Sequence, residues 1–284
     1  MGNVMTSEEV ARYRDRGIAF PFDAFSAQEA AEMRRKFEAA EARDGGALSP
    51  VSNRKPHLLM TWANDLIRDP RILDVVEDVL GPNILCWSSQ FFAKNPGDPS
   101  FISWHQDATY WGLSTADVLT VWLALSPSTP ASGCMQVVPG SHKQQVEHRD
   151  TFDANNMLSR GQEIAVEVRK EDVVDVVLQP GQFSMHNVLM FHGSEPNRSD
   201  DRRIGYAIRY IPTHVKQTID SGDSATLVRG VDEYRHFIQD PRPQSDFHPD
   251  AVKFHREVFE ARTKVLFAGA VQKGRRPDLA DAKS

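Results

Sequence analysis

The residues in this sequence with the clearest chemical potential are two histidines and one aspartate. His105 and Asp107 lie two positions apart in the segment FISWHQDATYWGL, and His192 follows much later in the chain. Side chains two apart on a β-strand point to the same face, so an extended segment would aim the imidazole and the carboxylate at one point. A distant histidine would complete a 2-His-1-carboxylate triad, which leaves positions on a non-haem Fe(II) open for a co-substrate and O₂.

Spacing alone does not identify the distant histidine. His186 and His192 both lie in the segment SMHNVLMFHGS, six residues apart, so an unbroken strand would place both on one face. His142 in VPGSHK is a third candidate, but its position at a turn predicts that it faces solvent. Aromatic residues around the His105 motif favour a pocket wall, although core packing explains each of them equally well.

A second candidate group lies in the segment RIGYAIRY. Its alternation predicts that one strand face carries Arg203, Gly205, Ala207 and Arg209, and the other Ile204, Tyr206, Ile208 and Tyr210. A guanidinium beside Gly and Ala has room to bind a carboxylate through two parallel hydrogen bonds. Either arginine satisfies this description. The alternative for both is a surface ion pair with Asp200 or Asp201.

The elements before residue 82 are predicted to be helical. Ser26 and Glu29 form a capping-box pattern ahead of a helix over 27–43. Asp69 as N-cap and Pro70 at the first helical position predict a second helix, which Gly81 and Pro82 end.

Beyond Pro82 the sequence changes to short apolar runs separated by Gly and Pro, typical of a β-sandwich or barrel. The predicted strands lie within 84–94, 117–127, 135–142, 172–182, 184–194 and 203–212. A helix over 255–267 and a frayed tail over 272–284 are expected next. We therefore expect one domain over 1–284, with a mostly helical part (1–81), a β core (82–215) and a C-terminal extension (216–284).

Composition excludes several classes of function. The net charge of −6, without a Lys/Arg-rich block, argues against a nucleic-acid partner. The sequence has neither an apolar run long enough for a membrane span nor a signal-peptide core. Cys86 and Cys134 show no CxxC or disulfide pattern, so we expect a cytoplasmic protein with Cys134 as a core residue. Nothing indicates an obligate protein partner.

The combined motifs WHQD (104–107), VPGSH (138–142), HGSxxN (192–197) and Arg203 resemble the phytanoyl-CoA dioxygenase (PhyH) family. That family comprises Fe(II)- and 2-oxoglutarate-dependent oxygenases, and the resemblance runs from about Val10 to Thr213. It implies a mainly β fold with helical elaboration. The core would be a cupin-like, jelly-roll double-stranded β-helix packed against N-terminal and C-terminal helices.

The resemblance also implies roles for individual residues. His105, Asp107 and His192 match the iron ligands, which favours His192 over His186. The residues that match the 2-oxoglutarate pocket are Arg203 on the distal carboxylate, Ser194 beside it, Gln106, Lys94 and the wall residue Trp122. Substrate contacts are expected from Trp87, Tyr110, Trp111, Arg209 and the segment 214–217.

The implied reaction is hydroxylation of an unactivated C–H bond in a small molecule, with release of succinate and CO₂. Related halogenases replace the carboxylate ligand with a small residue, so Asp107 favours hydroxylation over halogenation. The alternatives are a halogenase-like enzyme, an oxygenase for carrier-bound substrates, a zinc hydrolase or isomerase, and a non-catalytic cupin-like binding protein. Arg209 hints at an anionic substrate, and the lack of a phosphate-binding glycine loop favours a free molecule over a CoA ester.

Overall fold

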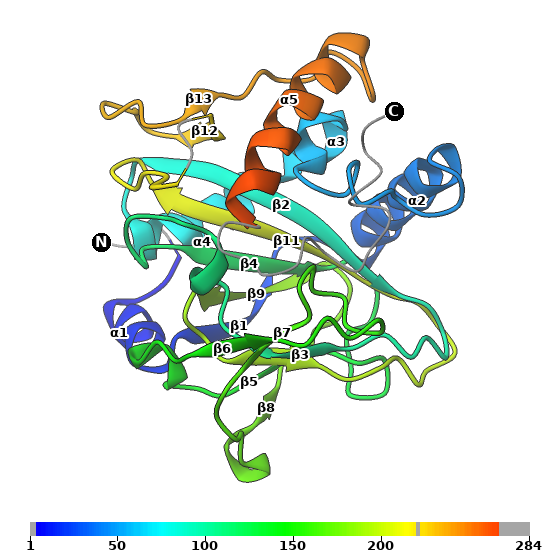
Figure 1. The fold of residues 1–284 in the computed structure, drawn as a ribbon, viewed down its shortest axis with the longest axis vertical. Helices are drawn as coiled ribbons and strands as arrows, with labels where there is room; N and C mark the ends of the chain where they lie inside the picture. Colours follow the sequence, from blue (N-terminus) through cyan, green and yellow to red (C-terminus); the bar gives the residue numbers. More distant parts are fainter. Residues whose placement is uncertain (1–3, 220–221, 267–284) are drawn as a thin grey trace.

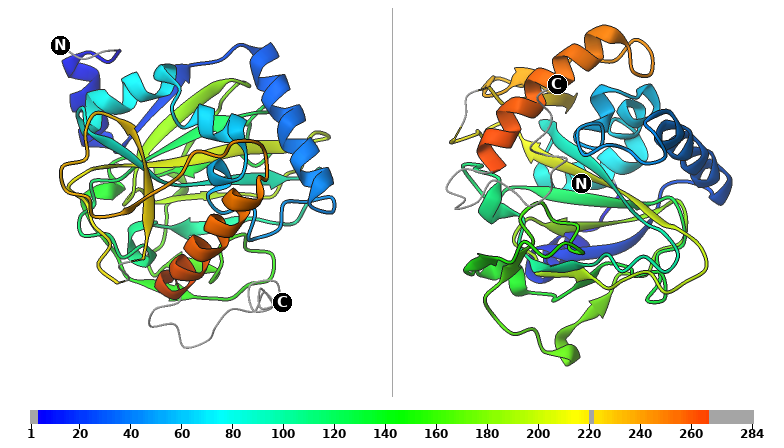
Figure 2. Two further views of the ribbon diagram at one scale, coloured as in Figure 1. Left: turned by 90° about the horizontal axis from the view of Figure 1, so that it is seen from above. Right: turned by 45° about the vertical axis from the view of Figure 1, so that its right-hand side comes forward.

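The computed structural model describes residues 4–219 and 222–266, and its core consists of two facing β-sheets (Figures 1 and 2). Most of the helices cover the outer face of the larger sheet, whereas the first helix lies beside the first strand. The helices are α1 (Ser7–Arg16), α2 (Ala27–Arg43), α3 (Thr61–Leu66), α4 (Pro70–Leu80) and α5 (Pro249–Leu266). The strands are β1 (Ile18–Asp23), β2 (Ile84–Lys94), β3 (Ile102–His105), β4 (Leu119–Ala124), β5 (Gln136–Val137), β6 (His148–Asp150), β7 (Gln162–Ile164), β8 (Val174–Asp175), β9 (Gln182–Asn187), β10 (His192–Ser194), β11 (Arg203–Pro212), β12 (Ser224–Arg229) and β13 (Ile238–Gln239).

The larger sheet has seven strands in the order β1-β9-β4-β11-β2-β12-β13. At its centre β11 pairs antiparallel with β2 from Arg203 opposite Lys94 to Pro212 opposite Ile84. The smaller sheet has the order β3-β10-β5-β8, and β6 and β7 form a separate ribbon. The long central strands of the larger sheet therefore face the short strands that carry the histidines.

The predicted alternation along β11 is confirmed. Ile204, Tyr206, Ile208 and Tyr210 lie in the core between the larger sheet and the helices. Arg203, Ala207 and Arg209 instead line a cavity between the two sheets. One strand thus supplies both the apolar core and the polar site, because successive side chains leave opposite faces.

The two predicted helix starts are confirmed. Ser26 and Glu29 form a reciprocal capping box at α2, and the Asp69 side chain accepts a hydrogen bond from the backbone N–H of Arg71 at α4. The predicted C-terminal helix is α5, which begins before residue 255. The tail predicted over 272–284 lies outside the described residues.

Three sequence expectations about the strands were wrong or incomplete. The N-terminal part contains β1, which pairs with β9, and the C-terminal extension contributes β12 and β13. The segment 184–194 is two strands in different sheets, β9 and β10, and the chain turns between them. The segments 135–142 and 172–182 hold only the short strands β5 and β8 and the start of β9.

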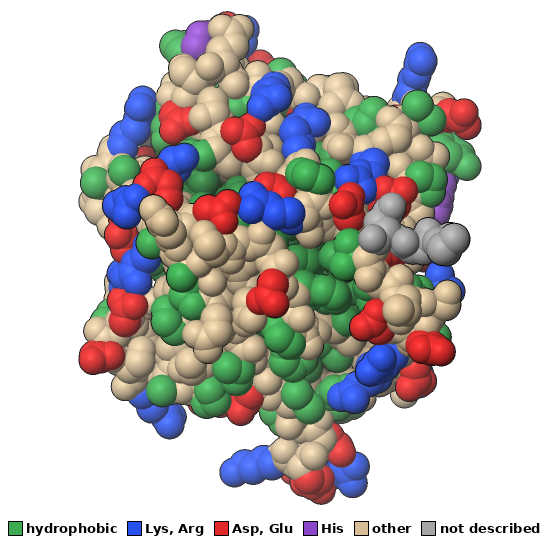
Figure 3. All heavy atoms as spheres, turned by 180° about the vertical axis from the view of Figure 1, so that it is seen from behind, with side chains coloured by type: hydrophobic (Ala, Val, Ile, Leu, Met, Phe, Trp, Pro, Cys, Tyr) green, Lys and Arg blue, Asp and Glu red, His purple; other side chains and the backbone are tan. Residues whose placement is uncertain are grey.

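The surface agrees with the mixed charge of the sequence. On the face seen in Figure 3, Lys and Arg side chains lie among Asp and Glu side chains. Among the described helices, none combines the length and the apolar character that crossing a bilayer requires.

We expect Phe91→Ala to lower the free energy of unfolding by about 3–5 kcal/mol. Phe91 is 2% exposed on β2, and its ring lies 4.3 Å from Tyr206, 4.7 Å from Phe37 and 5.5 Å from Trp62 between ring centroids. Removing it leaves a cavity where the sheet meets the helices. Urea unfolding measures the change. Tyr234→Ala removes an aromatic ring that is 56% exposed, and a similar loss in that control would contradict the prediction.

Candidate functional site

A cavity of about 210 Å³ lies between the two sheets, and both sheets contribute to its walls. His105, Asp107 and His192 line it from one side, and Arg203 and Arg209 line it from the larger sheet. The sequence-predicted ligands and both arginines are therefore brought to one cavity.

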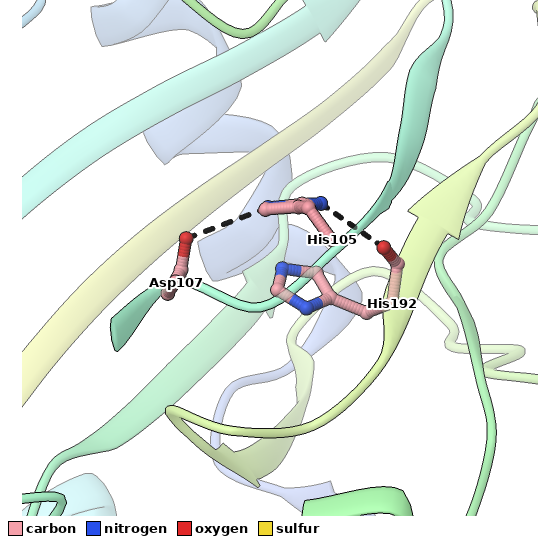
Figure 4. Close-up of side chains that lie close together, drawn as sticks. All are labelled: His105, Asp107 and His192. Carbon is pink, nitrogen blue, oxygen red and sulfur yellow. Dashed lines mark hydrogen bonds and ion pairs between the residues drawn. The ribbon is translucent and has the colours of Figure 1, made fainter. Parts of the chain in front are cut away.

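Strand pairing places the two histidines together. β3 and β10 are antiparallel neighbours, and His105 is the direct partner of His192. Their ring centroids are 4.0 Å apart (Figure 4). The pairing of β3 with β10, rather than proximity in sequence, therefore determines the relative positions of the two histidines.

Asp107 reaches the same point by a different route from the one predicted. β3 ends at His105, and Asp107 has helical backbone angles (φ −71°, ψ −35°) at the start of a 3-10 turn. The expectation that both residues lie on one extended strand was therefore wrong. The Asp107 N–H donates to the Val188 carbonyl at 3.1 Å, and Asp107 Oδ1 lies 3.4 Å from His105 Nε2.

The three side chains have the donor set of a metal centre. One ligand atom from each of His105, Asp107 and His192 lies within 4.8 Å of the others. His105 Nδ1 donates to the carbonyls of Ser103 (2.9 Å) and His192 (3.0 Å), and His192 Nδ1 donates to that of Met190 (3.0 Å). Because a carbonyl only accepts, Nδ1 carries the hydrogen in each ring, and Nε2 keeps its lone pair for a metal ion.

The electrostatics of these groups also suit a metal ion. Burial alone would raise the pKa of Asp107, but its contact with the His105 ring and the nearby positive charge of Arg209 lower it overall. Burial lowers the pKa of His192 well below its usual value. At neutral pH the site therefore presents a carboxylate and a neutral imidazole, the forms that bind metal.

His186 also faces the cavity, so strand parity could not distinguish it from His192. Its ring centroid is 4.9 Å from that of His192, but His186 belongs to β9 in the larger sheet. Among the described residues, the group with converging ligand atoms contains His192 and not His186. His142 lies outside the cavity in a 3-10 turn, where its Nε2 contacts the carbonyl of Arg14 at 3.0 Å.

Arg203 is a buried cation whose hydrogen bonds are incomplete within the described structure. It is 1% exposed, its guanidinium lies 5.1 Å from the Trp122 ring, and its Nε and Nη2 have no partner among the described residues. Burial lowers its pKa to about 10, so it stays charged at neutral pH. Arg203 is buried and forms no surface ion pair within the described part of the chain, and Asp201 pairs with Arg34 instead. Two unsatisfied donors in a cavity suit a carboxylate.

Lys94 supports the site without lining it. Its fully buried Nζ donates to Ser194 Oγ at 2.7 Å and to the carbonyls of Ser194 (3.2 Å) and Glu195 (2.5 Å). Burial and the neighbouring charge of Arg203 lower its pKa to about 7. Ser194 lines the cavity as expected, whereas Lys94 holds Ser194 in place.

Gln106, which was expected to contact the co-substrate, is not among the residues that line the cavity. Its Nε2 donates to the carbonyls of Gln144 and Leu189, and its Oε1 accepts from the N–H of Val146. The side chain is 0% exposed and ties together two loops behind the metal site. Trp122, in contrast, lines the cavity as a wall residue and packs against Gly205.

The four expected substrate contacts all line the cavity: Trp87, Tyr110, Trp111 and Arg209. Of the segment 214–217, only Gln217 reaches it, since His214 pairs with Asp117 at the surface. Sequence reasoning missed Asp223, which accepts from Trp87 Nε1 at 2.6 Å and from Gln217 Nε2 at 3.2 Å. It also missed Thr120, which alternation could have found because Thr120 lies two residues before Trp122 on β4.

Comparison with known proteins agrees with this geometry. The sequence profile of the phytanoyl-CoA dioxygenase (PhyH) family matches residues 2–205. A probable alpha-ketoglutarate-dependent hypophosphite dioxygenase from Stutzerimonas stutzeri is 29% identical over 231 residues, which cover 72% of this chain and 79% of that protein.

Solved structures are similar over most of the chain. The apo structure of the non-heme monooxygenase ThoJ matches with a TM-score of 0.81 and 36% identity, covering 91% of this chain and 97% of ThoJ. The structure of CytC3 with Fe(II) and alpha-ketoglutarate matches with a TM-score of 0.66 and 26% identity, covering 87% of this chain and 98% of CytC3. These similarities confirm the predicted fold class.

We expect Asp107→Ala to weaken Fe(II) binding by at least roughly a hundredfold, because one of three ligands and the only negative charge of the triad are lost. Anaerobic equilibrium dialysis measures the change. Asp117→Asn changes a carboxylate that is 57% exposed and serves as the control. Equal metal affinity in Asp107→Ala and the wild-type protein would refute the assignment.

We expect Gly205→Ala to disturb the anion site around Arg203. A Cβ atom at position 205 would lie 2.1 Å from the Trp122 ring, so the indole must move from beneath the guanidinium. Binding of 2-oxoglutarate to the Fe(II) protein should weaken by roughly tenfold, the effect of a misplaced charged hydrogen bond. Ala207→Gly alters the same strand face without adding an atom. A 2-oxoglutarate affinity in Gly205→Ala that matches this control contradicts the prediction.

Proposed function

The chain belongs to the phytanoyl-CoA dioxygenase (PhyH) family of Fe(II)/2-oxoglutarate-dependent dioxygenases, and from this premise we propose that it hydroxylates an unactivated C–H bond of a small molecule. In this reaction 2-oxoglutarate is converted to succinate and CO₂. The observation that carries the proposal is the convergence of the His105, Asp107 and His192 ligand atoms in one cavity with the buried guanidinium of Arg203.

The residues of the chain fit both groups that the reaction requires. His105, Asp107 and His192 would hold Fe(II) through two imidazole nitrogens and one carboxylate oxygen. Arg203 would bind the distal carboxylate of 2-oxoglutarate with its two unsatisfied donors. When bound together, iron and 2-oxoglutarate activate O₂ for oxidation of a C–H bond.

Other residues position the proposed metal ligands and the proposed 2-oxoglutarate residues. Trp122 packs against the guanidinium of Arg203, and Lys94 fixes Ser194 beside it. The backbone carbonyls of Ser103 and Met190 accept hydrogen bonds from Nδ1 of His105 and His192. These bonds favour the tautomer in which Nε2 carries no hydrogen and can bind a metal ion. Because these groups are buried, their electrostatic contacts are stronger than the same contacts would be in bulk water.

Asp107 supports hydroxylation over halogenation. A carboxylate occupies the coordination position that a halide would need, and its lowered pKa keeps it ionised. The retained Arg203, which a binding protein or a zinc hydrolase using the same triad has no need for, supports turnover of 2-oxoglutarate. We propose a free small molecule as the substrate, in a reducing compartment of the cell.

The test is 2-oxoglutarate binding and turnover by the Fe(II) protein. Arg203→Gln should raise the dissociation constant of 2-oxoglutarate by roughly tenfold or more, since a charge-assisted bidentate pair is lost. Arg203→Lys should recover only part of the affinity, because an ammonium group cannot form the bidentate pair. Anaerobic titration measures binding, and succinate formation in the presence of O₂ measures turnover.

Arg169→Gln serves as the control, since Arg169 is 67% exposed in a surface ion pair. The proposal fails if the wild-type Fe(II) protein neither binds 2-oxoglutarate nor forms succinate. It also fails if Arg203→Gln binds 2-oxoglutarate as tightly as the control.

A further inference from the structure

Four side chains form a row across the inner face of the larger sheet. Ser88 on β2 is the direct partner of Arg209 on β11, Arg209 is the partner of Thr120 on β4, and Thr120 is the partner of His186 on β9. All four line the cavity, with exposures of 5%, 8%, 2% and 2% respectively. We refer to Ser88, Arg209, Thr120 and His186 as the polar row.

The polar row is separate from the Arg203 site. Arg203 and Arg209 are six residues apart on the same strand face, so roughly 20 Å separates their backbones at about 3.3 Å per residue. Arg203 packs against Trp122, whereas the guanidinium of Arg209 lies 5.0 Å from the Trp111 ring. At its other end the row reaches the metal site, because the His186 and His192 rings are 4.9 Å apart.

Several polar atoms of the row have no partner within the described part of the chain. They are Thr120 Oγ1 and both ring nitrogens of His186. Buried polar atoms are nearly always hydrogen-bonded, and leaving them without a partner costs stability. Since Thr120 and His186 point into a cavity, a bound molecule is the natural partner for them.

The chemistry of the row selects the kind of group that it binds. The guanidinium only donates hydrogen bonds, the two hydroxyls and the imidazole can each donate as well as accept, and the row contains no carboxylate. Such a set matches a group that carries negative charge and only accepts hydrogen bonds, which is an oxyanion.

An aromatic wall adjoins the charged end of the row. The Trp87 and Trp111 rings are 5.1 Å apart, and Asp223 fixes the Trp87 indole through its N–H. This wall offers apolar area beside Arg209, because Trp111 contacts the guanidinium of Arg209. A small molecule with an anionic group and an apolar body would fill both parts.

We propose that the polar row binds an oxyanion of the primary substrate, a carboxylate or a phosphorus oxyanion, and so determines which molecule is oxidised. This inference rests on the proposed function, because the row is placed as a substrate site by its position beside the metal ligands. It assigns Arg209, Thr120 and His186 as specificity-determining residues, distinct from the 2-oxoglutarate residues.

The experiment compares charged and neutral probes of similar shape. Butanoate, propylphosphonate and butanamide are titrated by calorimetry into the anaerobic protein saturated with Fe(II) and 2-oxoglutarate. At least one anion should bind roughly tenfold or more tightly than the amide, the effect of one charge-assisted hydrogen bond. Arg209→Gln and the isosteric Thr120→Val should each reduce this preference severalfold, with 2-oxoglutarate affinity changed less than about twofold.

Arg169→Gln is the matched control for loss of an arginine, and it should keep the full preference. The inference is overturned if neither anion binds more tightly than the amide, or if Thr120→Val leaves the preference unchanged. It is also overturned if Arg209→Gln weakens 2-oxoglutarate binding as much as Arg203→Gln does, because the row would then serve the co-substrate. Failure of the wild-type protein to bind 2-oxoglutarate would instead contradict the proposed function.

Discussion

The pairing of β3 with β10 is the contact on which the site depends. It places His105 directly opposite His192, and the carbonyl of His192 accepts from the ring of His105. The same pairing fixes both the positions of the two imidazoles and the tautomer of one of them. Asp107 lies in the turn that follows β3, and this turn brings its carboxylate to the two imidazoles. The predicted metal ligands are thus brought together by two short strands, because the register of the strands favours one arrangement of the side chains.

The larger sheet stabilises a strand that carries buried arginines in the cavity between the two sheets. The outer face of β11 is apolar and packs beneath the helices, so the strand is held from behind by core contacts. Its inner face can then carry Arg203 and Arg209, whose burial costs stability unless an anion compensates for it. The core therefore stabilises a strand whose other face is suited to binding rather than to packing.

Alternation along β11 was predictable because a strand paired on both sides keeps a strict period of two. The convergence of His105, Asp107 and His192 was predictable from residue types and motif context. The choice between His186 and His192 was not predictable from parity, because the chain changes sheets between β9 and β10 and both rings still reach the cavity. The directions of Gln106 and Lys94 depend on hydrogen bonds to loops distant in sequence, which no local pattern encodes.

The two sheets carry different parts of the candidate site. The smaller sheet and its following turn supply all three predicted metal ligands, whereas the larger sheet supplies Arg203 and the polar row. Changes at Thr120 or Arg209 alter the wall of the cavity without moving β3 or β10, since those strands belong to the other sheet. The substrate preference of such a site could therefore change while the predicted metal ligands are retained. For this reason the shared fold and triad indicate the family chemistry, whereas the side chains that β4, β9 and β11 place in the cavity would select the molecule on which it acts.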